Sequence, residues 1–244
     1  MTLSLRDRKD RQHVDRKRGQ MKREVNLNDI SDGKLYGLND LVKADCNDCE
    51  GCFACCQGMG TSIQLDPLDI YNLIINLDCS FEELLNVKIE LNVVDGIILP
   101  NLKMDGLSEK CSFLSEEGRC KIHAFRPGIC RLFPLGRYYE NHSFQYFLQV
   151  HECKKQNRTK VKVRKWIDTP DLKNYESFVV DWHYFLLDVQ SYITTLQDVQ
   201  KIKEINMILL NQFYIKPYDK NCDFYLQFNA RLDEVRNSIP TSQS

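Results

Sequence analysis

The feature that most constrains this chain is a dense run of cysteines. Five of its eleven cysteines fall within eleven residues, in the sequence Cys46-Asn-Asp-Cys49-Glu-Gly-Cys52-Phe-Ala-Cys55-Cys56. Three more follow at Cys111, Cys120 and Cys130, and a further candidate is Cys153. A hydrophobic core has no use for thiols at this spacing, so they must act as disulfides, metal ligands or redox groups. The choice among these three chemistries determines the class of protein.

The expected compartment argues against disulfides. The first residues are polar and lack the apolar segment of a secretory signal, and no stretch approaches the roughly 18 uninterrupted apolar residues of a membrane span. We therefore expect a cytoplasmic protein with no membrane partner, in a reducing environment where structural disulfides are rare. An odd number of cysteines fits full pairing poorly, and the neighbours Cys55 and Cys56 would bridge each other only with strain. Metal binding is the favoured chemistry.

Charge is distributed unevenly along the 244 residues, whose formal net charge is −1. Residues 1–24 carry nine Lys or Arg against four Asp or Glu, with few apolar side chains, so we expect a flexible basic arm. The arm could contact an acidic protein or the phosphates of a nucleic acid. We favour a solubilising role, because no aromatic side chains alternate with its charges as base stacking requires.

Residues 25–160 show the patterns of short helices and β-hairpins. The segment Leu35–Lys43 indicates a short helix that leads into the cysteines. Asp66-Pro67 and Ser80-Phe-Glu-Glu83 are typical helix starts, with a capping side chain followed by proline or by a capping-box glutamate. Turn residues between apolar or aromatic runs predict hairpins. These turns are Asp95-Gly96, Glu116-Glu117-Gly118 and residues 140–143.

Helical periodicity dominates after Lys165. The pattern from Pro170 to Phe213 exceeds the usual length of about 25 residues for one globular helix, so we expect a break near Thr194–Asp198. A last helix runs through Phe224 to Val235. The predicted fold class is α+β, with a small cysteine-rich metal-binding domain of short helices and β-hairpins followed by C-terminal α-helices. The predicted parts are a basic arm (1–24), a metal-binding domain (25–160) and a helical region packed on it (161–244).

The spacing of the thiols suits a metal site. A Cys-x2-Cys turn brings two sulfurs around one ion. Cys49, Cys52 and Cys55 repeat this step and could wrap three thiolates around one cluster, as in bacterial ferredoxins. Because adjacent side chains point in different directions, Cys55 and Cys56 could serve one centre or two. The series Cys111-x8-Cys120-x9-Cys130 adds sulfurs from both arms of a hairpin and from the next turn.

Basic residues accompany these cysteines. Arg126, Arg131 and Arg137 could neutralise thiolates, or they could simply be solvated at the surface. His123 and His151 lie within three residues of expected ligands, and we expect hydrogen bonding rather than coordination from them.

Other residues are not assigned to the site. We interpret Cys79 and Cys222 as small buried hydrophobes. No phosphate-binding loop, nucleophile elbow or His-Glu-x-x-His motif is present, so the sequence assigns no catalytic residue.

Taken together, these motifs resemble the YkgJ-type cysteine-cluster family, which is described as zinc- or iron-chelating. The resemblance covers roughly Cys46 to Cys153 and rests on Cys49-x2-Cys52-x2-Cys55-Cys56, Cys111-Ser-Phe-Leu, Gly118-Arg119-Cys120-Lys-Ile-His and Arg126-Pro-Gly-Ile-Cys130-Arg-Leu-Phe-Pro134. Carried over by position, it implies the metal ligands Cys49, Cys52, Cys55, Cys56, Cys111, Cys120, Cys130 and Cys153. Cys46 exceeds the pattern, so an exchange between Cys46 and Cys49 stays open.

The resemblance implies an iron–sulfur cluster or zinc as the cofactor. Three functions follow: a metal-binding protein of unassigned cellular role, a protein-modifying enzyme related to flagellin lysine-N-methylase, or a zinc-stabilised module that binds a protein partner. The chain is short and shows no recognisable methyl-donor pocket, which argues against the enzyme. We favour the first function, with iron slightly ahead of zinc.

Overall fold

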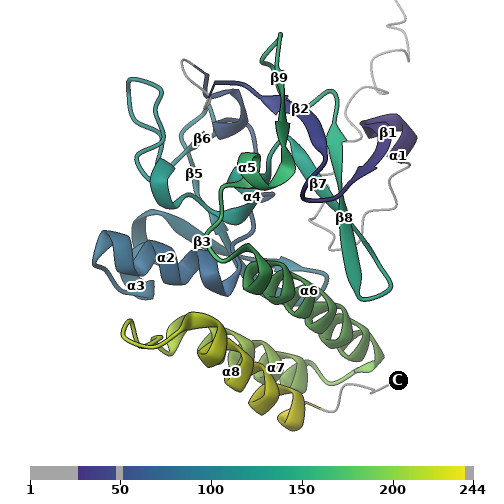
Figure 1. The fold of residues 1–244 in the computed structure, drawn as a ribbon. Helices are drawn as coiled ribbons and strands as arrows, with labels where there is room; N and C mark the ends of the chain where they lie inside the picture. Colours follow the sequence, from purple (N-terminus) through teal and green to yellow (C-terminus); the bar gives the residue numbers. More distant parts are fainter. Residues whose placement is uncertain (1–26, 48–51, 240–244) are drawn as a thin grey trace, which may run out of the picture.

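A computed structural model describes residues 27–47 and 52–239 (Figure 1). The predicted basic arm, residues 1–24, lies outside the described residues. The described elements are α1 (Leu27–Ile30), β1 (Ser31–Tyr36), β2 (Leu41–Asp45), η1 (Ala54–Cys56), α2 (Pro67–Leu77), α3 (Phe81–Val87), β3 (Ile89–Val94), β4 (Ile97–Leu102), β5 (Met104–Asp105), β6 (Lys110–Cys111), η2 (His123–Phe125), α4 (Gly128–Leu132), β7 (Leu135–Glu140), β8 (Ser143–Gln149), β9 (Thr159–Lys162), α5 (Val163–Ile167), α6 (Leu172–Thr195), α7 (Val199–Leu210), η3 (Asn211–Ile215) and α8 (Phe224–Ser238). This mixture of helices and short strands, with helices at the C-terminal end, confirms the predicted α+β class.

The described strands form small antiparallel sheets, in which β1, β8 and β7 make one sheet in that order and the others are pairs: β2 with β9, β3 with β4 and β5 with β6. The β3–β4 hairpin turns at Asp95 and Gly96, both with positive φ, as the Asp-Gly signal predicts. The β7–β8 hairpin turns in the same way at Asn141 and His142. Two of the three predicted hairpins are thus confirmed in full.

One local prediction was wrong. Leu35–Lys43 is not a helix, because it contains the end of β1, a turn and the start of β2. Within β2, Val42 and Ala44 are fully buried whereas Leu41 and Lys43 are exposed, which is the two-residue period of a strand.

The expected hairpin over Cys111–His123 is present in a short form, with antiparallel pairing between residues 113–115 and 119–121. Its two arms meet at an isolated bridge between Leu114 and Cys120. Cys111 belongs to β6, where it pairs with Met104 of β5.

The predicted N-cap at Asp66 and the predicted capping box at Ser80–Glu83 are both present, and the structure shows that Asp66 also belongs to a capping box, with Asp69. In α2, the Asp69 amide donates to Asp66 Oδ1 at 2.8 Å and the Asp66 amide donates to Asp69 Oδ2 at 3.2 Å. Ser80 and Glu83 exchange the same pair of bonds at the start of α3. These bonds satisfy amides that a helix start leaves without intrahelical partners.

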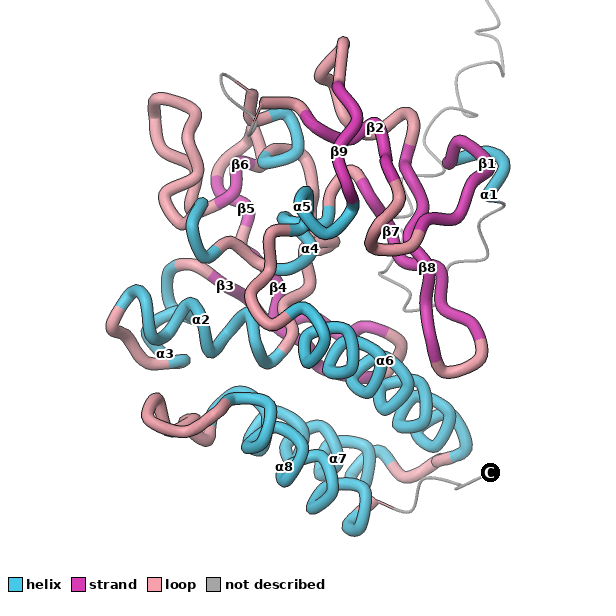
Figure 2. Tube along the Cα trace, viewed as in Figure 1, coloured by secondary structure: helices cyan, strands magenta, loops and turns pink. Residues whose placement is uncertain are grey.

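The C-terminal helices break where the sequence predicted, between α6 and α7. In Figures 1 and 2, α6 crosses the molecule between the strand-containing part and the pair α7 and α8. Trp182 of α6 packs its ring 4.9 Å from that of Phe213 and 6.1 Å from that of Phe228. Buried Asn206 of α7 accepts from the Ile98 amide at 2.6 Å and donates to the Gly96 carbonyl at 3.0 Å. These two hydrogen bonds join α7 to the β3–β4 hairpin.

One cluster of buried side chains runs through the whole described chain, from Val42 to Ile239. Strand β9 crosses the predicted boundary at residue 160 and pairs with β2. The division into domains stays a prediction, and the two parts share one hydrophobic core. Among the helices described, none combines the length and the apolar character that crossing a bilayer requires.

Candidate metal-binding site

A glycine turn brings the two cysteine motifs together. The ring of Phe53, which lies between Cys52 and Cys55, covers Gly118 at the turn before Cys120. A Cβ at Gly118 would lie 2.6 Å from the Phe53 ring, and Gly118 has φ +75°, so only glycine fits both the turn and the contact. The Gly58 amide also donates to the Glu109 carbonyl at 3.0 Å.

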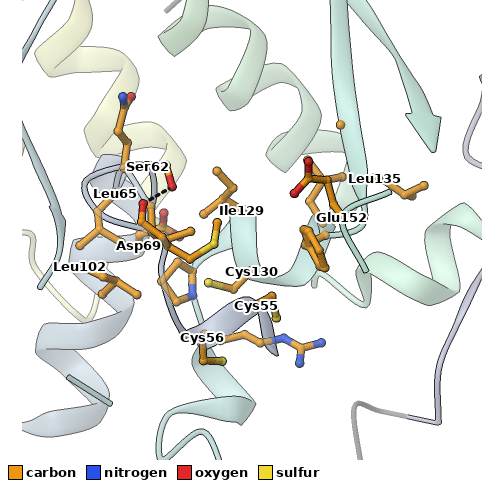
Figure 3. A pocket seen from close by; sticks show the side chains of 18 of the residues that line it. Cys55, Cys56, Ser62, Leu65, Asp69, Leu102, Ile129, Cys130, Leu135 and Glu152 are labelled. Atoms are coloured by element: carbon orange, nitrogen blue, oxygen red, sulfur yellow. Dashed lines mark hydrogen bonds between the residues drawn. The ribbon is translucent and has the colours of Figure 1, made fainter. Parts of the chain in front are cut away.

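Most of the predicted ligands line one cavity of about 760 Å³. Its wall includes Cys52, Cys55, Cys56, Cys111, Cys120 and Cys130. Cys55 and Cys56 come from η1, and Cys130 comes from α4. Figure 3 shows these three side chains gathered at one end of the cavity, with Asp69 and Glu152 on its flanks.

The other two predicted ligands are placed differently. Cys153 lines a recess of about 20 Å³ that it shares with Cys46, Cys52 and Cys55. Cys49 lies outside the described residues. Cys52 and Cys55 thus border both spaces, and Cys46, which exceeds the family pattern, lies beside Cys153.

The thiols of the cavity differ in acidity. A hydrogen bond from Cys56 lowers the pKa of Cys55 to about 7, with help from the charge of Arg126. The same bond and burial raise the pKa of Cys56. Burial also raises the pKa of Cys130. Thiolate is the form that binds metal, so loading this site would release protons.

Two acids also line the cavity: Asp69, which is buried, and Asp66, which is half-buried and which the sequence indicated only as a helix cap. Asp69 Oδ1 accepts from the Gly128 amide at 2.7 Å, and Gly128 is the first residue of the helix that carries Cys130. Burial raises the pKa of Asp69 well above 3.8, and the charge of Asp66 raises it further. Burial raises the pKa of Asp66 to about 6. A proline or capping signal gives no hint of this second role, because it depends on where α4 packs.

The arginines and histidines near the cysteines contact different parts of the molecule. Arg126 contacts His123 through Nη1, and both line the cavity. Arg131 donates to the Asp168 carbonyl at 3.2 Å. Arg137 Nη2 donates to the Tyr175 hydroxyl at 2.8 Å. His151 is exposed.

The two cysteines that the sequence assigned to packing differ in their exposure. Cys79 packs half-buried against the core, in line with its expected role. Cys222 is exposed, so the expectation that it is buried was wrong. It precedes α8 in a turn where its Sγ lies 3.5 Å from Asp219 Oδ2.

The donor set fits zinc or iron, because both metals take cysteine sulfur. The sulfurs come from η1, β6, α4 and the turn at Cys120, and they face one space that is large enough for an ion or a cluster. Among the residues that the structure describes, no three Cys, His, Asp or Glu side chains converge tightly enough to enclose an ion. The cavity therefore supplies soft donors around a common space rather than a closed coordination sphere.

Comparison with known proteins gives a match for one segment of the chain, the one that contains the predicted ligands. No curated protein and no solved structure matches the chain, so the relation to flagellin lysine-N-methylase has no support. Residues 48–163 match the model of the CxxCxxCC family, whose description is "Putative zinc- or iron-chelating domain". That match includes every predicted ligand. The similarity to this family therefore holds over the segment that carries the predicted ligands, which is slightly less than half of the chain.

Proposed function

We propose that this protein binds iron, as an iron–sulfur cluster, through the thiolates of its cysteine-cluster domain. The single observation that carries the proposal is the cavity wall, on which cysteines from distant parts of the sequence face one space. Iron is favoured over zinc because Cys49, Cys52 and Cys55 have the two-residue spacing of ferredoxin-type ligands. The proposed ligands are Cys49, Cys52, Cys55, Cys56, Cys111, Cys120, Cys130 and Cys153.

Eight thiolates exceed the four that one structural zinc or one common iron–sulfur cluster takes. The placement of Cys153 apart from most of the other ligands is the observation that favours two centres. Cys111, Cys120 and Cys130 line only the cavity, whereas Cys153 lines only the recess. Cys52 and Cys55 border both spaces and could serve either centre.

The first experiment is metal analysis with visible spectroscopy on protein purified without oxygen or chelator. Iron–sulfur thiolates absorb visible light, whereas d¹⁰ zinc does not. We expect near-stoichiometric iron and a coloured protein. Stoichiometric zinc in a colourless protein would support metal binding but would contradict the iron–sulfur cluster. A preparation with neither metal would refute the proposal.

Serine variants test which thiols bind. Cys130→Ser should lose metal, because its side chain lies at the crowded end of the cavity. Cys222→Ser is the matched control, since it makes the same atomic change at an exposed thiol far along the chain. Full metal content in Cys130→Ser, or loss in Cys222→Ser, would contradict the assignment.

Cys153→Ser tests the number of centres. If the recess is a second centre, this variant should lose part of the metal and keep the spectrum of the rest. Complete loss in Cys153→Ser would indicate a single centre that spans both spaces.

A further inference from the structure

The cavity extends well beyond its cysteines. A tetrahedral zinc with sulfurs at about 2.3 Å fills a sphere of only about 50 Å³, against a cavity of about 760 Å³. Pockets for small organic ligands span roughly 300–1,000 Å³. The part of the wall that comes from β7 and α6 includes Arg137, Trp182 and Leu186.

Arg137 is held in this part as a partly unsatisfied cation. It shares a face of β7 with Leu135 and Tyr139, because alternate residues of a strand point the same way. Its Nη2 donates to the Tyr175 hydroxyl at 2.8 Å, and its guanidinium lies 5.5 Å from the Phe144 ring centroid. Its Nε is buried and has no hydrogen-bond partner among the described residues. A buried donor left in this state costs free energy unless a ligand or water accepts from it.

The surroundings of Arg137 restrict the charge of such a ligand. Asp66 and Asp69 line the same cavity and lie within electrostatic range of Arg137. Any negative charge on Asp66 or Asp69 would repel a dianion such as phosphate more strongly than a monoanion. A planar carboxylate also matches the geometry of a guanidinium.

Helix α6 supplies an apolar wall beside this cation. Val179, Trp182 and Leu186 all line the cavity. Next to them the Tyr139 ring stacks on His183 with centroids 3.6 Å apart and planes 10° apart. An apolar body of a ligand would be covered by these side chains while its charged end met Arg137.

We propose that this part of the cavity binds a small organic monocarboxylate with an apolar body, with its carboxylate on Arg137 and its body against α6. The inference goes beyond the proposed metal function and does not depend on it. It assigns to the domain an organic ligand beside the cysteine cluster.

The test is titration of the protein as purified with hexanoate and cyclohexanecarboxylate. The chain's two tryptophans, Trp166 and Trp182, both line the cavity, so fluorescence reports binding, and calorimetry checks it. At least one carboxylate should bind saturably. Cyclohexylmethanol and inorganic phosphate should bind at least about tenfold more weakly, because each lacks the single charge or the apolar body. No saturable binding of either carboxylate up to about 10 mM, a concentration at which even weak specific binding is detected, or equal binding of phosphate, would overturn the proposal.

Variants place the ligand. Arg137→Gln should weaken carboxylate binding by about tenfold or more, as expected for loss of a charge-assisted hydrogen bond, while metal content stays unchanged. Arg164→Gln is the matched control, because Arg164 is exposed on α5 and does not line the cavity. If Arg137→Gln does not fold, Arg137→Lys keeps the charge without Nε and should still weaken binding. Undiminished carboxylate binding in a folded Arg137 variant overturns the proposal.

Metal analysis of the same samples separates the two proposals. Metal without carboxylate binding would refute this inference and leave the proposed function standing. Carboxylate binding without metal would do the reverse.

Discussion

Gly128 is a position where one added methyl group should disturb the site. It begins α4, two residues before Cys130, and its amide donates to Asp69. A Cβ built on Gly128 would lie 2.4 Å from the Tyr175 hydroxyl oxygen. Gly128→Ala therefore forces Tyr175 or α4 to move.

The size of the effect follows from these contacts. A carbon and an oxygen approach to about 3.3 Å in ordinary contact, so the hydroxyl must retreat by about 0.9 Å. That movement would stretch its 2.8 Å hydrogen bond with Arg137 beyond bonding distance. Losing a bond to a charged group costs about 1.5–3 kcal/mol, and overpacking costs about 1–3 kcal/mol. Alanine returns up to about 1 kcal/mol through helix propensity. We expect a net loss of about 2–5 kcal/mol in the free energy of unfolding.

Urea unfolding at fixed metal concentration would measure this loss, with metal content recorded on the same protein. Gly37→Ala is the matched control. Its added Cβ would lie 3.5 Å from Asp40 Oδ2, an ordinary contact, and the backbone at Gly37 does not require positive φ. It should change stability by less than about 1 kcal/mol.

Tyr175→Phe supplies the decisive comparison. Without the hydroxyl, the nearest ring atom would be Cζ, at 3.5 Å from the Cβ that Gly128→Ala adds. The double variant should therefore be more stable than the two single losses predict, by about 1 kcal/mol or more. Additive losses, or a Gly128→Ala variant as stable as Gly37→Ala, would refute the reasoning.

Three further predictions follow from other parts of the chain. Burial raises the pKa of Asp66 from its ordinary value of 3.8 to about 6. Between about pH 4 and pH 6 the folded protein therefore keeps a proton that the unfolded chain has lost, so this group lowers the free energy of unfolding as pH rises through that range. Asp66→Asn keeps a capping oxygen, so its stability relative to the parent should rise by about 1–3 kcal/mol between pH 4 and pH 7; a difference that does not vary with pH would contradict this. Asn206→Ala should cost about 1–3 kcal/mol in urea unfolding, because the buried Ile98 amide loses its acceptor, and an unchanged midpoint would show that water replaces the side chain. Deleting residues 1–24 should leave metal content and thermal stability unchanged, since that segment has few apolar side chains with which to pack on the site; loss of metal would assign the segment to the site.

The candidate site was predictable from the sequence in its chemistry more than in its layout. Cys52, Cys55 and Cys130 were recognisable as candidate ligands from their spacing and from the family resemblance, and they do line one cavity. The placement of Cys153 in a separate recess was not predictable. Neither was the presence of Asp69 on the cavity wall, because Asp69 is held there by a contact with a distant segment.

The sequence by itself determined the local starts, turns and breaks of this protein. Asp66, Ser80 and Asp95-Gly96 act through hydrogen bonds and dihedral preferences that involve only the next few residues. Tertiary structure decided the strands that depend on distant partners. Leu41 pairs with Lys162 in the β2–β9 sheet, and no local pattern near Leu35–Lys43 records that partner. The cavity is also a tertiary product, because close approach of η1, α2, α4, β7 and α6 is set by the packing of a shared core.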